Sequence, residues 1–130
     1  MAIETRREQL QRLTGEFLDA FNRCDLDGVM AFFADDGAVY DEFTGTANEG
    51  LDAIRAAFTP QFEGAFGDMK FIDEDLFIDD IDDKVMASWR CTLVVKGQAT
   101  AWRGLDLIHW RGDEITHKST YAKTKVPLFE

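Results

Sequence analysis

The segment WRGLDLIHW, residues 102–110, decides the fold of this chain. Successive side chains of a β-strand point to opposite faces, so one face of this segment carries Trp102, Gly104, Asp106, Ile108 and Trp110. A largely apolar face that alternates with a mixed one is typical of a half-buried strand. The apolar face holds one carboxylate, and a buried carboxylate is costly unless it is hydrogen-bonded or protonated. Asp106 is therefore the first residue to examine for function.

The same period of two continues on both sides of this segment. Residues 85–95 alternate in the same way, and Gly97 with Gln98 makes the turn into the central strand. Gly112 and Asp113 are typical of a hairpin turn, which makes residues 115–123 the last strand. Alternation points four side chains of that strand inward: Thr116, Lys118, Thr120 and Ala122. From Gly67 onward the pattern predicts three or four long strands.

The residues before Gly67 predict three helices. Residues 4–24 repeat apolar side chains at steps of three and four, among them Phe17 and Phe21. Asp25 can cap a second, shorter helix. A third helix begins after Gly50, and Pro60 marks its end or a break.

Between the second and third helices the sequence predicts a short strand, residues 38–43, followed by a loop at residues 44–50. On this strand Val39, Asp41 and Phe43 share one face, which we expect to point inward. Helices followed by a long antiparallel sheet indicate one α+β domain over residues 1–130, with the helices on one face of the sheet.

The other face of the sheet carries more apolar side chains than a solvated face needs. Leu105, Leu107, His109 and Tyr121 fall on it by alternation. We therefore expect a homodimer that forms through this outer face. His109 and His117 both lie on that face, where a surface or interface role is favoured over catalysis.

The composition excludes several classes of partner. A net charge of −11 argues against nucleic acid, and no apolar run is long enough to predict a membrane span. The N-terminal residues lack the apolar core of a secretory signal, so we expect a cytoplasmic protein. Acidic residues 73–84 fit a solvated hairpin better than a metal site, because they include no glycine-containing ligand loop. Cys24 and Cys91 are expected to be buried free thiols.

The order of these segments resembles a known superfamily. The stretch LDAFNRCDLDGVMAFFADDGAVYDEFTG, followed by EGLDAIRAAF and the strand pair GLDLIHW and GDEITHKSTY, resembles the NTF2-like superfamily and its SnoaL-like and ketosteroid-isomerase-like group. The resemblance runs from about Glu8 to Tyr121. It implies an NTF2-like, or cystatin-like, cone in which three N-terminal helices pack on a curved, mostly antiparallel sheet around a ligand pocket. The fold alone does not fix a function.

The resemblance also implies roles for two aspartates. Asp41 stands where the steroid isomerases keep the aspartate that moves a proton between two carbons. Asp106 stands where they keep a second, protonated aspartate that stabilises the enolate oxygen together with a tyrosine. From the residues alone, Asp41 could instead accept hydrogen bonds from loop N–H groups. Asp106 could likewise make only a structural bond to a neighbouring strand or to Lys118.

Three departures from the group change the chemistry that we expect. Phe17 replaces the oxyanion tyrosine, and Phe33 and Phe58 stand where tyrosines often support it. A phenyl ring donates no hydrogen bond, and losing one oxyanion donor costs roughly 100- to 1000-fold in rate. The steroid isomerase route is therefore disfavoured. Thr120 stands where limonene-epoxide-hydrolase-type relatives carry a catalytic aspartate, so that activity is disfavoured too.

The other candidate residues would line the pocket. Lys118 could pair with Asp106, hold a substrate carboxylate, form a Schiff base or extend to the pocket rim, and Thr120 offers a polar contact. An aromatic set would touch the ligand or only build the core: Phe17, Phe21, Phe33, Phe58, Trp89 and Trp102.

Together these residues predict an enzyme that transfers protons on a small apolar carbonyl compound, by isomerisation, dehydration or cyclisation. Asp41 would be the base and Asp106 the hydrogen-bond donor or second acid. This chemistry needs neither cofactor nor metal. The alternative is a non-catalytic module that binds a small molecule or dimerises.

Overall fold

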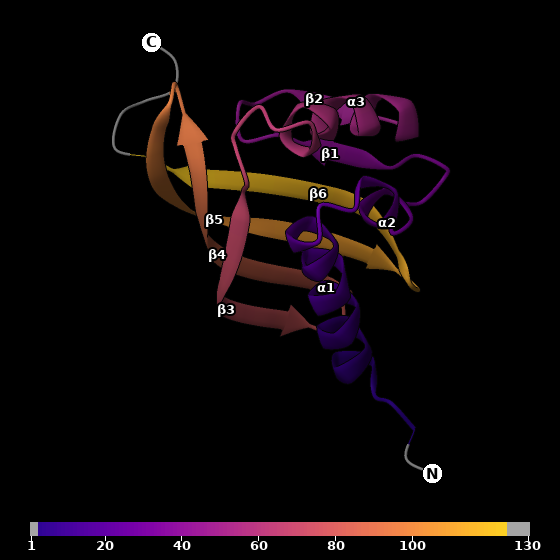
Figure 1. The fold of residues 1–130 in the computed structure, drawn as a ribbon. Helices are drawn as coiled ribbons and strands as arrows, with labels where there is room; N and C mark the ends of the chain where they lie inside the picture. Colours follow the sequence, from indigo (N-terminus) through magenta and orange to yellow (C-terminus); the bar gives the residue numbers. More distant parts are fainter. Residues whose placement is uncertain (1–2, 125–130) are drawn as a thin grey trace.

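The computed structural model describes residues 3–124 as an α+β fold (Figure 1). Three helices come first along the chain, interrupted by two short strands, and four long strands follow. The helices are α1 (Arg6–Asn22), α2 (Leu26–Met30) and α3 (Leu51–Phe62). The strands are β1 (Val39–Asp41), β2 (Ala47–Glu49), β3 (Lys70–Asp79), β4 (Lys84–Val95), β5 (Gln98–Arg111) and β6 (Glu114–Lys123). The predicted fold class and the predicted helices are confirmed, whereas β2 lies in the predicted loop.

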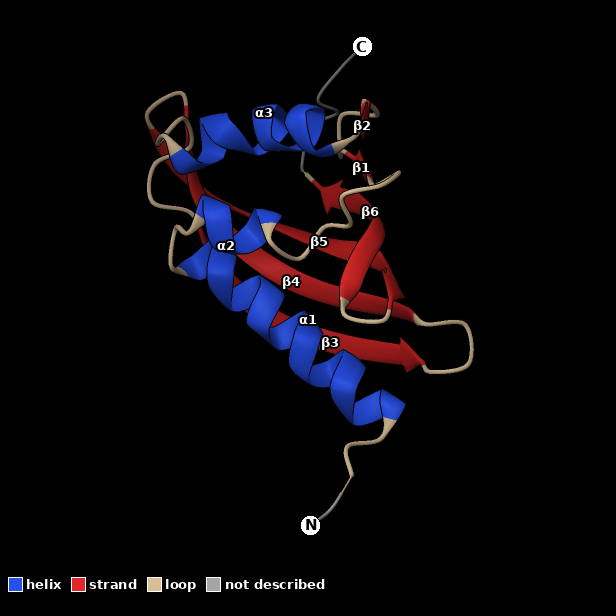
Figure 2. Cartoon of the chain, turned by 90° about the vertical axis from the view of Figure 1, so that its right-hand side faces the viewer, coloured by secondary structure: helices blue, strands red, loops and turns tan. Residues whose placement is uncertain are grey.

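All six described strands form one curved sheet. Its strand order is β2-β1-β6-β5-β4-β3; among these six described strands β1 and β6 pair in parallel, and the other neighbours pair antiparallel. Residues 102–110 lie within β5, which pairs with β4 and β6 over most of its length. Figures 1 and 2 show the three helices on the same side of the sheet, with α1 crossing β3 and β4 and α3 lying beside β1 and β2.

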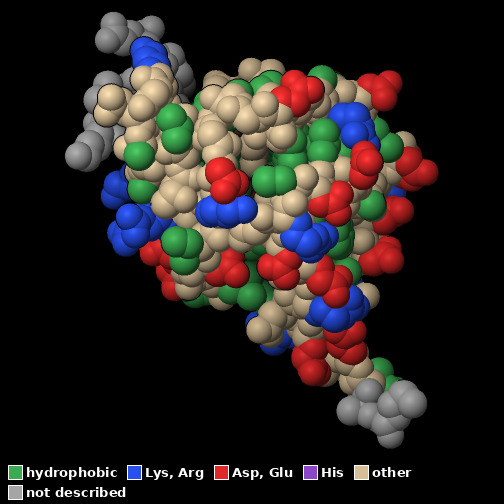
Figure 3. All heavy atoms as spheres, in the orientation of Figure 1, with side chains coloured by type: hydrophobic (Ala, Val, Ile, Leu, Met, Phe, Trp, Pro, Cys, Tyr) green, Lys and Arg blue, Asp and Glu red, His purple; other side chains and the backbone are tan. Residues whose placement is uncertain are grey.

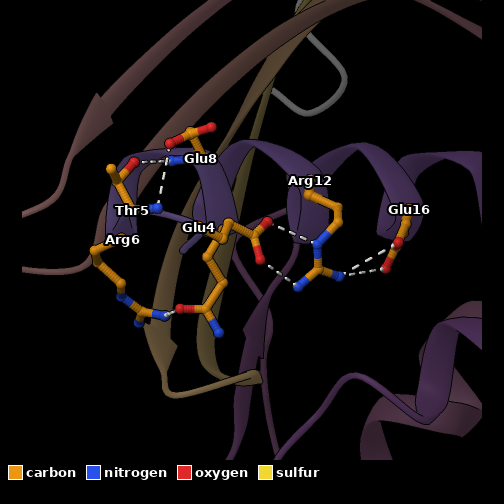
Figure 4. A network of polar contacts seen from close by, with 7 residues as sticks. Glu4, Thr5, Arg6, Glu8, Arg12 and Glu16 are labelled. Atoms are coloured by element: carbon orange, nitrogen blue, oxygen red, sulfur yellow. Dashed lines mark hydrogen bonds and ion pairs between the residues drawn. The ribbon is translucent and has the colours of Figure 1, made fainter. Parts of the chain in front are cut away.

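Polar contacts fix where α1 begins and attach its other end to the sheet. The Thr5 hydroxyl accepts the Glu8 backbone N–H, and the Glu8 side chain accepts the Thr5 N–H, which forms a capping box (Figure 4). On the exposed side Arg12 bridges Glu4 and Glu16. At the other end the Asn22 side chain bonds both backbone groups of Phe71, which fastens the helix to β3.

The core lies between the helices and the concave face of the sheet. Apolar side chains from the helices meet those of the long strands there, and the fully buried ones include Leu10, Phe17, Ile54, Phe58, Val85, Ile108 and Ile115. On β5 the side chains of Asp106, Ile108 and Trp110 are buried, while Leu107 is 37% exposed on the other face. The predicted inward face of this strand is confirmed.

Two local predictions are corrected by the structure. Pro60 neither ends nor breaks α3, which continues to Phe62. A proline this close to the helix end removes only one backbone bond, and the next turn still closes through Glu63 N–H to Thr59. Both cysteines are free as expected, but Cys24 is exposed, whereas burial raises the pKa of the Cys91 thiol to about 12.

Charge is spread over the surface. Figure 3 shows acidic side chains across the helical face, with basic ones among them. Acidic residues 73–84 form the end of β3 and its turn into β4, as predicted. Within the described part of the chain, no helix is long and apolar enough to cross a bilayer.

Candidate active site

A cavity opens between the concave face of the sheet and the helices. Its volume is about 70 Å³, which gives room for a few water-sized groups. Nearly half of the residues that line it are aromatic: Phe21, Tyr40, Phe43, Phe58, Phe71, Trp89 and Trp102. Phe43 and Trp102 are half-buried and meet edge to face, with their ring centroids 5.8 Å apart, so they belong to the part of the wall that reaches solvent.

Three donors converge on Asp106 at the buried end of this cavity. The indole N–H of Trp89 donates to Oδ2 at 3.1 Å, and the Thr120 hydroxyl donates to Oδ1 at 2.7 Å. The Lys118 ammonium lies 3.1 Å from the same Oδ1. The register explains this convergence, because Asp106 lies opposite Thr120 on β6, and Trp89 on β4 lies two residues beyond the position paired with Asp106. A carboxylate has about four lone-pair positions, so one on Oδ2 stays free.

The Lys118 side chain is buried almost completely. Its Nζ donates to the Thr120 hydroxyl at 2.7 Å and lies 4.5 Å from the centre of the Tyr40 ring. The rings of Phe58 and Phe21 lie 5.5 and 5.7 Å away. The ion pair with Asp106 and the surrounding aromatic faces both attract the positive charge of this ammonium group. Lys118 therefore balances the Asp106 charge and keeps one further N–H for a ligand.

Tyr40 lies next to this pair on β1. Its position opposite Lys118 in the parallel β1–β6 register turns its ring into the cavity, where it stacks on Phe58 with centroids 4.4 Å apart. Burial first, and then the Asp106 charge, raise the pKa of the Tyr40 phenol. The phenol therefore stays protonated near neutral pH and can donate a hydrogen bond.

The structure corrects the expected direction of Asp41. Because Tyr40 points inward, its neighbour Asp41 falls on the opposite face of the strand, beside Ser119, and does not line the cavity. The inward face of this strand is therefore one residue out of phase with the predicted face. Phe43 still reaches the cavity, because the chain leaves the strand after Asp41.

The aromatic candidates divide into two groups. Phe21, Phe58, Trp89 and Trp102 line the cavity with Lys118 and Thr120. Phe17 and Phe33 do not: they are buried in the core and contact each other edge to face. Phe17, which the resemblance aligns with the oxyanion tyrosine, thus does not reach the cavity.

The arrangement of Asp106 also differs from the one that the resemblance implies. Its three partners are donors, so this carboxyl group accepts hydrogen bonds instead of donating one. The sequence pattern did not single out Tyr40 at all. The one available signal was Ala38, which shares its face and is buried too.

Comparison with known proteins identifies the family to which this fold belongs. The model of the SnoaL-like domain family matches residues 15–118. No curated protein matches the chain.

Among solved structures, a proposed polyketide cyclase from Xanthomonas campestris pv. campestris superposes with a TM-score of 0.76 at 22% identity, covering 90% of this chain and 92% of that chain. An NTF2-like protein of unknown function from Burkholderia pseudomallei K96243 gives 0.75 at 15% identity, with 88% and 90% covered. TerC, co-crystallised with polyporic acid, gives 0.74 at 11% identity, with 88% and 91% covered. At such identities these structures establish the fold alone, whereas the family match covers most of the sequence. The chain belongs to the SnoaL-like domain family and has its NTF2-like fold.

Proposed function

We propose that this protein is a cofactor-independent enzyme that transfers protons on a small, largely apolar carbonyl compound. The observation that carries the proposal is the Asp106 carboxylate, buried in an aromatic cavity and held by Trp89, Thr120 and Lys118 with one lone pair of Oδ2 free. A carboxylate held in a partly aromatic cavity, with donors nearby for the carbonyl oxygen, is an arrangement that can remove a proton next to a carbonyl.

The proposed chemistry needs two complementary groups. The free lone pair of Asp106 Oδ2 would take a proton from the carbon next to the carbonyl. The remaining N–H of Lys118 and the phenol of Tyr40 would donate to the carbonyl oxygen as it gains negative charge. These two donors would supply the hydrogen bonds to the oxyanion that the phenyl ring of Phe17 cannot donate. Returning the proton to another carbon gives isomerisation, and loss of a β-hydroxyl or attack on a second carbonyl gives dehydration or cyclisation.

The cavity restricts the substrate that we propose. Its aromatic wall favours a flat, unsaturated molecule, and its volume of about 70 Å³ admits only the reacting end without movement at Phe43 and Trp102. Two similar folds support this class of ligand, since one is a proposed polyketide cyclase and the other was crystallised with polyporic acid.

Exchange of substrate hydrogen with solvent deuterium tests the proposal whichever net reaction the enzyme completes. A panel of small ketones and β-dicarbonyl compounds would be incubated with the protein in D₂O and followed by proton NMR. We expect enzyme-dependent loss of the signal of the carbon-bound hydrogen, and Asp106→Asn to slow it at least about 100-fold. Asp52→Asn, a change at an exposed carboxylate on α3, is the matched control. An exchange rate in Asp106→Asn equal to that of the unmodified protein would contradict the proposal.

The alternative role, a non-catalytic binding module, predicts a different result in the same experiment. Ligands would shift the resonances of Trp89 and Trp102, but no carbon-bound hydrogen would exchange. Asp41 remains the second candidate for the base, although it lies outside the cavity. We retain the homodimer through the outer sheet face and the cytoplasmic location as predictions; cell fractionation tests the second.

A further inference from the structure

The chain contains two histidines, and the sheet brings them together. His109 on β5 lies directly opposite His117 on β6, so both side chains lie on the outer face, away from the cavity. Their ring centroids are 5.2 Å apart and the rings are tilted by 32°. Both residues are half-buried.

This spacing allows both rings to reach one metal ion. An imidazole nitrogen binds Zn²⁺ at about 2.0–2.1 Å, which places the ion about 3 Å from each ring centroid. Two imidazoles that share an ion therefore have centroids within about 6 Å of each other. The observed 5.2 Å lies inside that limit without movement of either strand.

A neighbouring hydroxyl orients one of the rings. His117 Nε2 lies 2.9 Å from Ser119 Oγ, two residues along β6. When Nε2–H donates to this hydroxyl, the free lone pair of the ring lies on Nδ1. Metal-binding histidines usually donate their second ring N–H to a partner in this way.

We propose that His109 and His117 form a two-imidazole site for a borderline divalent transition metal ion, Zn²⁺, Ni²⁺ or Cu²⁺, on the outer face of the sheet. Imidazole is a preferred ligand of these ions, and water or a side chain of a second copy across the predicted dimer face would complete the coordination. The net charge of −11 attracts cations to the protein as a whole. Lys84 lies opposite His109 and opposes binding, but its exposed side chain can turn its ammonium into solvent.

A second group of possible ligands provides an internal comparison. Asp35, Asp36 and Glu114 bring carboxylate oxygens within 4.8 Å of one another. Arg111 contacts both Asp36, at 2.5 Å, and Glu114, at 3.4 Å, and so already supplies a positive charge. Binding at the histidine pair and binding at these acids respond to different substitutions.

The test is a titration of the full chain, prepared without a histidine tag, with Cu²⁺ alone and separately with Zn²⁺ alone. We expect saturable binding of one ion per chain, and the Cu²⁺ electron paramagnetic resonance spectrum should show nitrogen ligands. Binding should be lost in His109→Asn and in His117→Asn and unchanged in Glu114→Gln. Ser119→Ala should weaken it by about tenfold, because the orienting hydroxyl is removed.

A measurement on the unmodified chain guards against variants that fail to fold. The ring resonances of His109 and His117 should shift together with one Zn²⁺ equivalent, while the cavity indole of Trp89 does not move. Absence of saturable binding, binding that survives both histidine substitutions, or binding lost only in Glu114→Gln would overturn the proposal.

Discussion

The pair formed by Asp106 and Lys118 shows why each charge is tolerated in this interior. Each side chain is only 4% exposed, and transfer of either charge from water costs several kcal/mol. The pair offsets that cost through the ion pair itself, two hydrogen bonds through Thr120 and one from Trp89. Removing one partner leaves the other charge buried without its counterion.

Lys118→Met should therefore lower the free energy of unfolding by about 3 kcal/mol at neutral pH. Asp106→Asn, which leaves an unpaired ammonium, should also destabilise the protein. The double variant should lose less stability than the sum of the two, because neither charge remains. Urea unfolding of all four proteins measures this coupling, and strict additivity would contradict the role of the ion pair.

His109 gives a pH prediction that is independent of the cavity. Partial burial, and then the charges of His117 and Lys84, lower its pKa from the ordinary value of 6.5. The folded state thus favours neutral imidazole. The stabilising contribution is complete above pH 6.5 and is lost as the pH falls from there through the lowered pKa of the folded state.

Histidines titrate between about pH 7.5 and about pH 5. As the pH is lowered through this range, the free energy of unfolding should fall less in His109→Asn than in the unmodified protein. The variant replaces a titrating ring by a neutral amide. The unmodified protein, measured at the same pH values, is the reference. Equal pH dependence of the two proteins would contradict this account of His109.

The packing of β4 against β5 depends on one glycine. A Cβ atom added at Gly104 would collide with the Trp89 ring and would lie 2.5 Å from the Tyr121 carbonyl oxygen. Trp89 is opposite Gly104 in the register, and its indole holds Asp106. The absence of a side chain at Gly104 therefore leaves room for the Trp89 ring next to β5, from where its indole reaches the carboxylate.

Gly104→Ala should destabilise the protein by about 2 kcal/mol through overpacking and should displace the Trp89 indole. Gly15→Ala is the matched control, because nothing lies within 4 Å of a Cβ atom added there in α1. That change should stabilise the protein by about 0.5–1 kcal/mol, since alanine loses less backbone entropy in a helix. Thermal unfolding compares the stabilities of Gly104→Ala and Gly15→Ala. Equal effects of the two substitutions would contradict the role given to Gly104.

The accuracy of the sequence predictions depended on the length of each segment. On β5 and β6 the alternation runs over many residues, so the inward positions of Asp106, Lys118 and Thr120 followed from the sequence. On β1, which has three residues, Val39 and Tyr40 are both apolar enough to point inward, so the sequence does not determine which face of the strand carries Asp41. The short polar strand β2 shows no alternation that the sequence could reveal.

The curved sheet as a whole presents two unlike faces. The concave face surrounds the core and the cavity, whereas the convex face exposes apolar side chains, including Leu107 at 37% and Tyr121 at 56%. Side chains of this kind in the middle of a sheet favour association with a second copy. The predicted homodimer would cover them.

Light scattering tests this assembly. We expect a particle of twice the 14.8 kDa chain mass, and Leu107→Lys should convert it to the monomer, because a charge placed in an apolar interface is left without a partner. Glu63→Lys adds the same side chain at an exposed position just after α3 and should leave the mass unchanged. A monomer in the unmodified protein would contradict the prediction.

The decisive measurement compares the two aspartates as bases in the deuterium exchange reaction. With the best substrate from the panel, we predict that Asp106→Asn lowers the exchange rate at least about 100-fold, while Asp41→Asn lowers it less than about tenfold. That result would assign proton transfer to the carboxylate inside the cavity. Normal exchange in Asp106→Asn, together with loss of exchange in Asp41→Asn, would contradict this account and make Asp41 the base.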